Sequence, residues 1–235
     1  MSQILNLKSH SCYAIIVAGG SGSRMQSALP KQFLLINGLP VLMHTLLAFY
    51  NSDTKPGLIL VLPADYHEYW QQLCIRHNFV IPHQLAIGGE TRFHSVKNGL
   101  DLIADNEESI IAVQDAVRPL TSSEIIDNAY KHAAAYGNAV VAVKSRDSIR
   151  QLKNNTSVAL TRDEIYLVQT PQTFQSAQLK AAYRQEYNPK FTDDASVVEE
   201  TGVKINLIAG SYQNIKITFP EDVAIAELLL KLPNL

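Results

Sequence analysis

Short apolar runs alternate with segments of helical periodicity over the first 143 residues, and this alternation restricts the possible folds more than any other feature of the chain. The apolar runs typical of buried strands are residues 13–17, 57–62, 84–87 and 110–114. The segments typical of helices are residues 41–50, 65–77, 91–103 and 124–136. Such an alternation predicts right-handed βαβ units. We therefore expect an α/β fold: a mostly parallel, Rossmann-like sheet with helices on both faces and ligands at the carboxyl ends of its strands.

The composition fits one globular domain that spans residues 1–235. With 46% hydrophobic residues, the chain can bury a continuous core. A formal charge of -2 and a pI near 6.4 provide no overall attraction to nucleic acid or to an acidic membrane surface. The chain begins without the apolar segment of a signal peptide, and no apolar run approaches the roughly 20 residues of a membrane-spanning helix. Cys12 and Cys74 form no CxxC pattern and are expected as reduced thiols, so we expect a cytoplasmic protein that binds neither nucleic acid nor membrane.

The pattern changes after residue 143. Two short alternating stretches flank the turn-prone segment KNNTS, which predicts a protruding β-hairpin arm at about residues 145–165. A hairpin without a core of its own needs a surface to pack against, and a second copy of the chain is the simplest candidate. We therefore expect a homodimer. Beyond the arm, we expect a helix around residues 176–187, a strand near residues 205–209 and a terminal helix opened by Pro220.

The segment AGGSGSR, residues 18–24, directly follows the first expected strand. Glycines permit positive φ, and successive backbone N–H groups can form a concave anion site. Arg24 adds a planar cation, and Lys31 lies seven residues further on, behind Pro30. The segment provides donors and fixed positive charge but no acid–base side chain. It therefore predicts a phosphate-binding loop, with a simple tight turn as the alternative interpretation.

Two common phosphate motifs do not match this loop. A Walker loop needs Lys-Ser or Lys-Thr directly after its last glycine, but Gly22 is followed by Ser23 and Arg24. The Rossmann fingerprint needs a third glycine where Met25 stands, and no Asp or Glu follows about 20 residues later to hold a ribose. A nicotinamide dehydrogenase is therefore disfavoured.

Further segments of the chain match a known family. AGGSGSRM is followed by PKQF, GGETRFHSV, DAVRP, QTPQTF, TDDAS and NIKIT, in that order and across nearly the whole chain. Together they closely resemble the 2-C-methyl-D-erythritol 4-phosphate cytidylyltransferases of the non-mevalonate isoprenoid pathway, whereas the first loop alone also resembles sugar-phosphate and molybdopterin nucleotidyltransferases. The resemblance implies cytidylyl transfer from CTP to 2-C-methyl-D-erythritol 4-phosphate, giving 4-diphosphocytidyl-2-C-methyl-D-erythritol and pyrophosphate.

The resemblance also implies where CTP binds. Arg24 and Lys31 are implied to stabilise the α-phosphate as it becomes five-coordinate, and small residues are implied to hold the cytosine. Glu90 departs from the aspartate that is more usual in the family. The implied CTP-binding residues are Ala18, Gly19, Gly20, Ser21, Gly22, Ser23, Arg24, Lys31, Gly89, Glu90, Ser95, Asp115 and Ala116.

A second set of residues is implied to bind the polyol phosphate. Arg162 and Lys216 complete the implied catalytic set with Arg24 and Lys31, and Arg162 resembles a residue lent across a dimer interface. The implied substrate-binding residues are Asp115, Arg118, Ser148, Arg162, Thr170, Thr192 and Lys216.

This second set includes a departure from the usual family motif, and several of its residues have a simpler interpretation. The usual HDAARP motif reads QDAVRP here, so Asp115 loses a possible histidine neighbour to Gln114. Taken alone, Arg118 or Arg162 would be a surface ion-pair partner, and Lys216 could extend its amine from an apolar strand to solvent. TDDAS could be only a capped helix start.

The implied chemistry needs no catalytic base. A phosphate monoester has a second pKa of about 6, so at neutral pH it is largely dianionic and can attack directly. Mg²⁺ is expected to bridge the triphosphate oxygens, and the seven histidines show no metal-ligand spacing that would predict a protein-held metal. Two alternatives remain open: a ribitol 5-phosphate cytidylyltransferase, against which TDDAS argues, and a nucleotide-binding regulatory protein without turnover.

Overall fold

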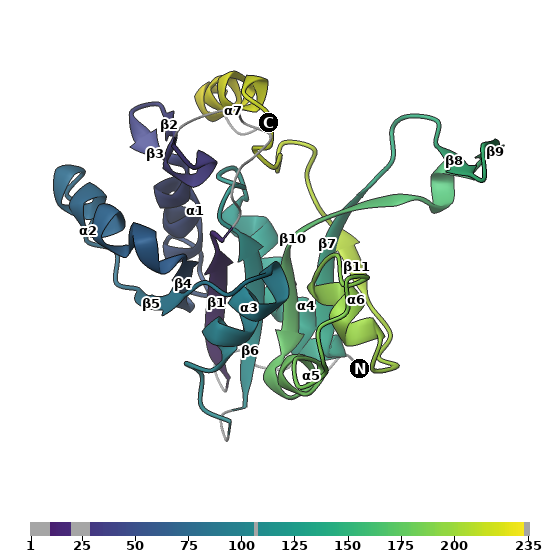
Figure 1. The fold of residues 1–235 in the computed structure, drawn as a ribbon, viewed down its shortest axis with the longest axis horizontal. Helices are drawn as coiled ribbons and strands as arrows, with labels where there is room; N and C mark the ends of the chain where they lie inside the picture. Colours follow the sequence, from purple (N-terminus) through teal and green to yellow (C-terminus); the bar gives the residue numbers. More distant parts are fainter. Residues whose placement is uncertain (1–9, 20–28, 106–107, 233–235) are drawn as a thin grey trace.

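The computed structural model describes residues 10–19, 29–105 and 108–232, and a seven-stranded sheet forms its centre (Figure 1). The strand order is β11-β7-β10-β6-β1-β4-β5. The strands are β1 Ser11–Val17, β4 Gly57–Leu62, β5 Gln84–Ile87, β6 Ser109–Asp115, β7 Asn138–Lys144, β10 Tyr166–Gln175 and β11 Leu207–Ala209. Pairings within this sheet are parallel except those of β10, which runs antiparallel to β6 and β7. The predicted α/β fold with a mostly parallel sheet is confirmed.

Helices cover both faces of the sheet, because successive residues of a strand point to opposite faces. On one face, Ala14 and Ile16 of β1 join a core cluster with residues of α1, α2 and α4. On the other face, Ile15 joins a cluster with residues of α3, α5 and α6. The helices are α1 Val41–Tyr50, α2 His67–Arg76, α3 Arg92–Leu100, α4 Ser123–Tyr136, α5 Ser176–Ala182, α6 Asp194–Glu199 and α7 Glu221–Lys231.

The helix starts follow local capping chemistry. The Ser122 hydroxyl accepts a hydrogen bond from the backbone N–H of Ile125 at the start of α4, and Asp193 forms a capping box with Ser196 at the start of α6. Pro220 precedes α7, as predicted. Gly99 lets α3 lie close to the sheet, because a Cβ at this position would meet Ile15 Cγ2 at 2.7 Å.

Strand β10 was not predicted, and this is the largest difference between the expected and observed folds. Its inner part buries polar residues, among them Thr170, Gln172 and Thr173, and it contains Pro171. A run of polar residues with a proline does not resemble a central strand. The proline lies where the β7–β10 register shifts, between Val168 and Gln172. The sheet therefore gains an antiparallel strand that brings polar side chains beside the end of β6.

The predicted arm is present. It consists of β8 Arg150–Lys153 and β9 Thr156–Ala159, which pair antiparallel in a sheet of their own and project away from the main sheet (Figure 1). Asn154 and Asn155 connect them with positive φ values of 50° and 60°, as a two-residue hairpin turn requires. Both strands are exposed along their whole length, and an isolated hairpin is marginally stable in water.

The two cysteines, Cys12 and Cys74, are free and partly buried. Burial raises the pKa of each thiol to about 11, so both are protonated near neutral pH. Within residues 10–19, 29–105 and 108–232, no helix combines the length and apolar character needed to cross a bilayer.

Candidate active site

The candidate site lies at the carboxyl ends of β1 and β6, where Val17 and Asp115 are partners in the parallel register. Ala18 and Gly19 follow β1, and the backbone N–H of Ala116 donates to the Val17 carbonyl at 3.0 Å. This is the edge at which parallel α/β sheets bind ligands. The remaining residues of the predicted phosphate loop, Gly20, Ser21, Gly22, Ser23 and Arg24, lie outside the described residues.

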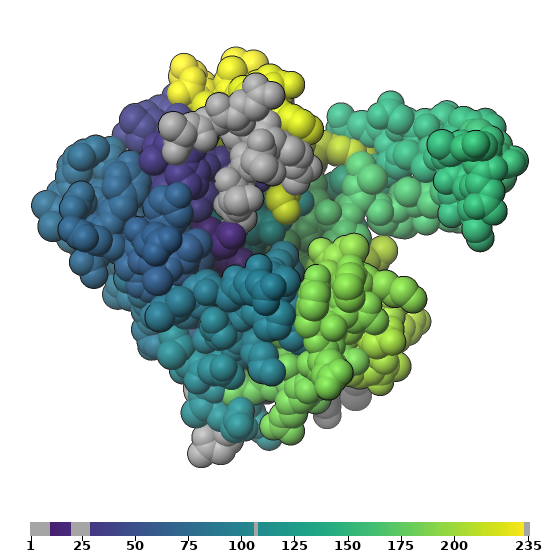
Figure 2. Space-filling model, viewed as in Figure 1, coloured from purple at the N-terminus to yellow at the C-terminus, as the bar shows by residue number. Residues whose placement is uncertain are grey.

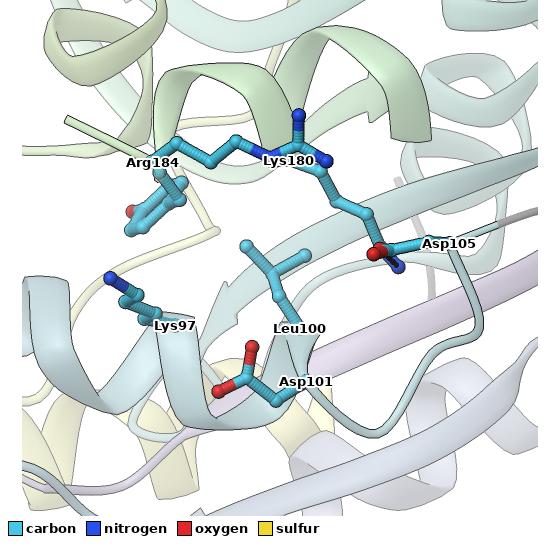
Figure 3. Close-up of a pocket in the computed structure, with 7 residues that line it drawn as sticks. Lys97, Leu100, Asp101, Asp105, Lys180 and Arg184 are labelled. Atoms are coloured by element: carbon cyan, nitrogen blue, oxygen red, sulfur yellow. Dashed lines mark hydrogen bonds and ion pairs between the residues drawn. The ribbon is translucent and has the colours of Figure 1, made fainter.

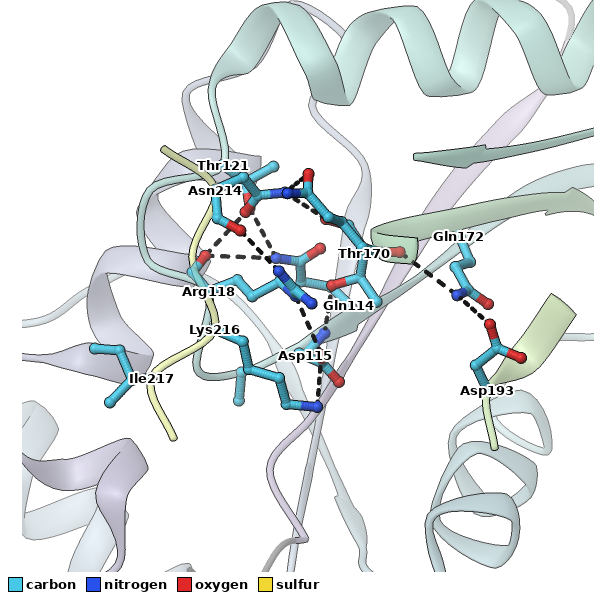
Figure 4. A network of polar contacts seen from close by, with 12 residues as sticks. Gln114, Asp115, Arg118, Thr121, Thr170, Gln172, Asp193, Asn214, Lys216 and Ile217 are labelled. Atoms are coloured by element: carbon cyan, nitrogen blue, oxygen red, sulfur yellow. Dashed lines mark hydrogen bonds and ion pairs between the residues drawn. The ribbon is translucent and has the colours of Figure 1, made fainter. Parts of the chain in front are cut away.

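Asp115 is the centre of a cluster of positive charges. Its carboxylate lies 3.0 Å from Lys216 Nζ and 3.2 Å from Arg118 Nε (Figure 4). It also lies 3.8 Å from Arg92 Nε. The Asp115 and Arg118 side chains are nearly buried, whereas the Lys216 side chain is 41% exposed. Lys216 is therefore the member of the cluster that solvent reaches most easily.

The cluster keeps Asp115 ionised. Burial alone would raise the pKa of its carboxyl, but the positive charges of Arg92, Lys216 and Arg118 hold that pKa well below its usual range. Burial also lowers the pKa of Arg118, an effect that Asp115 opposes. Asp115 is therefore a fixed negative charge at neutral pH rather than a general base.

This cluster predicts a pH-dependent contribution to stability. Because the folded-state pKa of Asp115 is depressed, the contribution is fully present above the unfolded value of about 3.9 and declines as the pH falls below it. The urea midpoint of an Asp115→Asn variant should lie below that of the wild-type protein at pH 7, and the difference should shrink toward pH 3. A difference that stays constant between pH 7 and pH 3 would contradict this assignment.

Arg92 belongs to the site, although the sequence analysis gave it no role. It begins α3, and its Nη1 and Nη2 atoms donate to the two carboxylate oxygens of Asp194 at 2.9 and 2.6 Å. Burial would lower the pKa of Arg92, but Asp194 outweighs this effect and raises it. The Tyr183 hydroxyl also donates to Asp194. The signal for Arg92 was present in the quoted segment GGETRFHSV, but no partner for its charge could be read from the sequence.

Residues predicted to hold the nucleotide gather near Gly19. The backbone N–H of Gly89 donates to Ser95 Oγ at 3.0 Å, and a Cβ on Gly19 would lie 3.1 Å from the same oxygen. The absence of a side chain at Gly19 therefore allows the backbone at this residue to lie close to α3. Glu90 is exposed beside them. The structure brings Gly19, Gly89 and Ser95 together, while their contacts with a nucleotide remain predictions.

Lys31 lies in a short 3₁₀ helix, Lys31–Phe33, and is 8% exposed. Its Nζ donates to the Ile217 carbonyl at 3.0 Å. Ile217 is the residue after Lys216, so Lys31 contacts the extended segment that carries the other predicted catalytic lysine. The order of the elements along the chain gave no indication of this contact.

Thr170 and Gln114 lie next to Asp115 and make different polar contacts. The Thr170 hydroxyl accepts the backbone N–H of Asp115 at 3.1 Å, which places it beside the cluster, and its contact with substrate stays a prediction. Gln114 points the other way and donates from Nε2 to Thr121 Oγ1 at 3.0 Å. The glutamine at this position therefore does not contact the Asp115 carboxylate.

Three of the predicted substrate-binding residues do not join the Asp115 cluster through any hydrogen bond or ion pair among the described residues. Ser148 is exposed on the chain leading into the arm. Arg162 lies on the arm, 54% exposed, and its Nε is 3.9 Å from Asp163 of its own chain. Thr192 is exposed, and its backbone N–H donates to Ser196 Oγ. TDDAS does start a capped helix, with Asp193 as the cap, and the contact of Thr192 with the polyol phosphate stays a prediction.

A separate surface pocket lies between α3 and α5 (Figure 3). Its polar side chains are already partly paired, because Lys180 donates to the Ile103 carbonyl and to Asp105. Its lining residues are Lys97, Leu100, Asp101, Asp105, Lys180, Tyr183 and Arg184. None of the predicted site residues is among them, although the hydroxyl of Tyr183 donates to Asp194, the partner of Arg92.

Comparisons with known proteins agree with the motifs. A sequence model of the 2-C-methyl-D-erythritol 4-phosphate cytidylyltransferase family matches residues 12–232. The chain belongs to this family. A 2-C-methyl-D-erythritol 4-phosphate cytidylyltransferase of Bacteroides fragilis is 48% identical, over 92% of this chain and 98% of the relative.

Solved structures of the same family share the fold. The crystal structure of 4-diphosphocytidyl-2C-methyl-D-erythritol synthase from Anaerococcus prevotii matches with a TM-score of 0.82 and 26% identity, over 98% of this chain and 100% of that one. The 2-C-methyl-D-erythritol 4-phosphate cytidylyltransferase of Francisella tularensis matches with a TM-score of 0.77 and 30% identity, over 93% of this chain and 99% of that one. As a member of this cytidylyltransferase family, the chain is a nucleotidyltransferase enzyme of isoprenoid biosynthesis.

Proposed function

We propose that the enzyme uses the Asp115 cluster, together with the phosphate-binding loop predicted at residues 18–24, to transfer the cytidylyl group of CTP to the phosphate of 2-C-methyl-D-erythritol 4-phosphate. The products are 4-diphosphocytidyl-2-C-methyl-D-erythritol and pyrophosphate. The observation that carries the proposal is the concentration of cations at one edge of the sheet in a chain of this family. Arg92, Arg118 and Lys216 carry three positive charges against the two negative charges of Asp115 and Asp194, which leaves an excess of one.

This charge suits the reaction. The accepting phosphate is largely dianionic at neutral pH and attacks without a base. Two anions must then be held in line while negative charge moves to the leaving pyrophosphate, so placement and positive charge supply most of the acceleration. Lys216 and Arg118 are suited to the accepting phosphate, and Lys31 with Arg24 to the α-phosphate of CTP.

Mg²⁺ is proposed as the metal of the reaction, held mainly by the CTP phosphates. Among the described residues, no group of three or more His, Cys, Asp or Glu side chains is placed to hold a metal ion. Asp115 and Asp194 are the carboxylates beside these cations, and three cations already share Asp115. A hard cation that keeps several waters and binds phosphate oxygens fits this arrangement, where it would neutralise charge on the triphosphate.

A homodimer formed through the arm is also proposed. The arm exposes Leu152, Val158 and Leu160, and an open notch separates it from the segment that contains α5 and α6 (Figure 2). A groove of about 540 Å³ lies at the base of the arm, lined in part by Tyr166 and Tyr212. A second copy would cover these apolar surfaces and bring its Arg162 to the Asp115 cluster.

A cytoplasmic location fits CTP as substrate and the free thiols.

A direct assay separates this function from the ribitol 5-phosphate alternative. CTP-dependent release of pyrophosphate should be fast with 2-C-methyl-D-erythritol 4-phosphate and at background with ribitol 5-phosphate. Faster release with ribitol 5-phosphate would reverse the assignment. CTP binding in calorimetry, without pyrophosphate release from either polyol phosphate, would instead favour a regulatory protein.

A further inference from the structure

The extended segment from Asn214 to Ile217, which precedes α7, carries one predicted catalytic lysine, Lys216, and contacts the other, Lys31. We call it the strap. Lys216 of the strap pairs with Asp115, and the Ile217 carbonyl accepts a hydrogen bond from Lys31. The two ends of the strap are fixed by different contacts. This difference is the basis of the inference.

Asn214 fixes the first end, and it is completely buried. Its Nδ2 donates to the Thr170 carbonyl at 2.9 Å and to Gln169 Oε1 at 3.2 Å. Its Oδ1 accepts from Thr121 Oγ1 at 2.9 Å, and its backbone carbonyl accepts from Arg118 Nη1 at 2.7 Å (Figure 4). The side-chain amide thus has partners for both its oxygen and its nitrogen, and one orientation satisfies them.

These contacts form a chain of polar groups. Gln114 Nε2 donates to the Thr121 hydroxyl, which can in turn donate to Asn214 Oδ1. Gln114, Thr121 and Asn214 are all buried, so loss of one member leaves the others without water as a substitute. The network therefore holds Arg118 directly, and it holds Lys216 through the backbone two residues away.

Ile217 fixes the second end independently. Its side chain is completely buried in a cluster with Ile36, Val41, Val117 and Ala226, and its backbone N–H donates to the Val117 carbonyl at 2.9 Å. The carbonyl that holds Lys31 belongs to this end. A disturbance at Asn214 should accordingly move Lys216 and Arg118 while leaving Lys31 in place.

We infer that Asn214, held by Thr121 and Gln114, is a positioning residue that sets Lys216 and Arg118 for the accepting phosphate and leaves the CTP side of the site unaffected. The inference rests on the proposed function, in which these two cations bind the polyol phosphate. It assigns a role to three buried polar residues.

The test uses two variants of the full-length enzyme and a matched control. Thr121→Val keeps the shape but removes the hydroxyl, Thr121→Ser keeps the hydroxyl, and Asn214→Asp replaces the two N–H donors by an acceptor. Thr121→Val should raise the KM for 2-C-methyl-D-erythritol 4-phosphate on the order of tenfold, the loss expected when buried polar groups lose a partner. The KM for CTP should stay within about twofold of the wild-type value. Thr121→Ser should have wild-type KM values, and Asn214→Asp should raise the KM for 2-C-methyl-D-erythritol 4-phosphate more than Thr121→Val does.

The split between the two KM values separates positioning from a purely structural role. Equal increases in both KM values, an increase for CTP alone, or a lower melting temperature with both KM values unchanged would overturn the inference. Failure of the proposed function is a different result, namely no pyrophosphate release by the wild-type enzyme. In that case, calorimetric binding of 2-C-methyl-D-erythritol 4-phosphate to wild type and Thr121→Val still tests the positioning: tenfold weaker binding supports it and equal binding overturns it.

Discussion

Lys31→Ala should lower kcat by about 10²–10³-fold, or about 2.7–4 kcal/mol, the effect of removing one donor that stabilises a transition state. Lys31 is the described cation closest in sequence to the loop after β1, and its amine is held on the Ile217 carbonyl. Such fixed placement means that its charge needs no reorganisation during the reaction. Steady-state pyrophosphate release with saturating CTP and 2-C-methyl-D-erythritol 4-phosphate provides the measurement.

Two controls separate the charge of Lys31 from its packing, because this side chain is 8% exposed and its truncation leaves a gap. Lys31→Met retains most of the buried stem without the charge and should lose nearly as much activity as Lys31→Ala. Lys190→Ala removes an exposed lysine outside the site and should change nothing. A Lys31→Met enzyme with wild-type kcat would show that the charge is not needed.

The sequence predicted the parallel part of the fold well, because buried strands and amphipathic helices differ in length and period. Residues 57–62 and 84–87 became strands with the expected limits. Strand β10 was missed because its buried positions are polar. The segment that contains Thr170 and Gln172 therefore has the composition of a loop. Their burial is explained only by partners far along the chain: Thr170 accepts from Asp115, and Gln172 accepts from the Ala195 backbone and donates to Asp193.

The candidate site likewise contains residues that the sequence predicted and residues that it did not. Motif order identified Asp115, Arg118 and Lys216, and the structure brings these three together. Arg92 and Asn214 could not be found by this reasoning, because each acts through contacts about 100 residues away, with Asp194 and Arg118 respectively. A lone arginine or asparagine within a motif gives no information about such a partner.

Mixing two weakly active variants should restore activity if Arg162 acts in the site of the partner chain. Arg162→Ala and Lys216→Ala should each lower kcat/KM by about 10²-fold or more, since each removes a cation from the accepting phosphate. Within one chain, Arg162 lies on the arm beside Asp163, whereas Lys216 pairs with Asp115. A mixed dimer therefore has one site that lacks both cations and one site that is intact.

The size of the recovery is set by symmetry. Random reassortment makes about half of the dimers mixed, and each of these has one intact site of two, so co-refolded enzyme should regain about a quarter of wild-type activity. Arg150→Ala, which also removes an arm arginine, should be active by itself and so marks the effect of altering the arm surface. Activity equal to the average of the two separate variants would mean that Arg162 does not cross between chains. Recovery near a quarter would instead require that the arm of one chain completes the cation cluster of the other, because within each variant chain one of the two charges is missing.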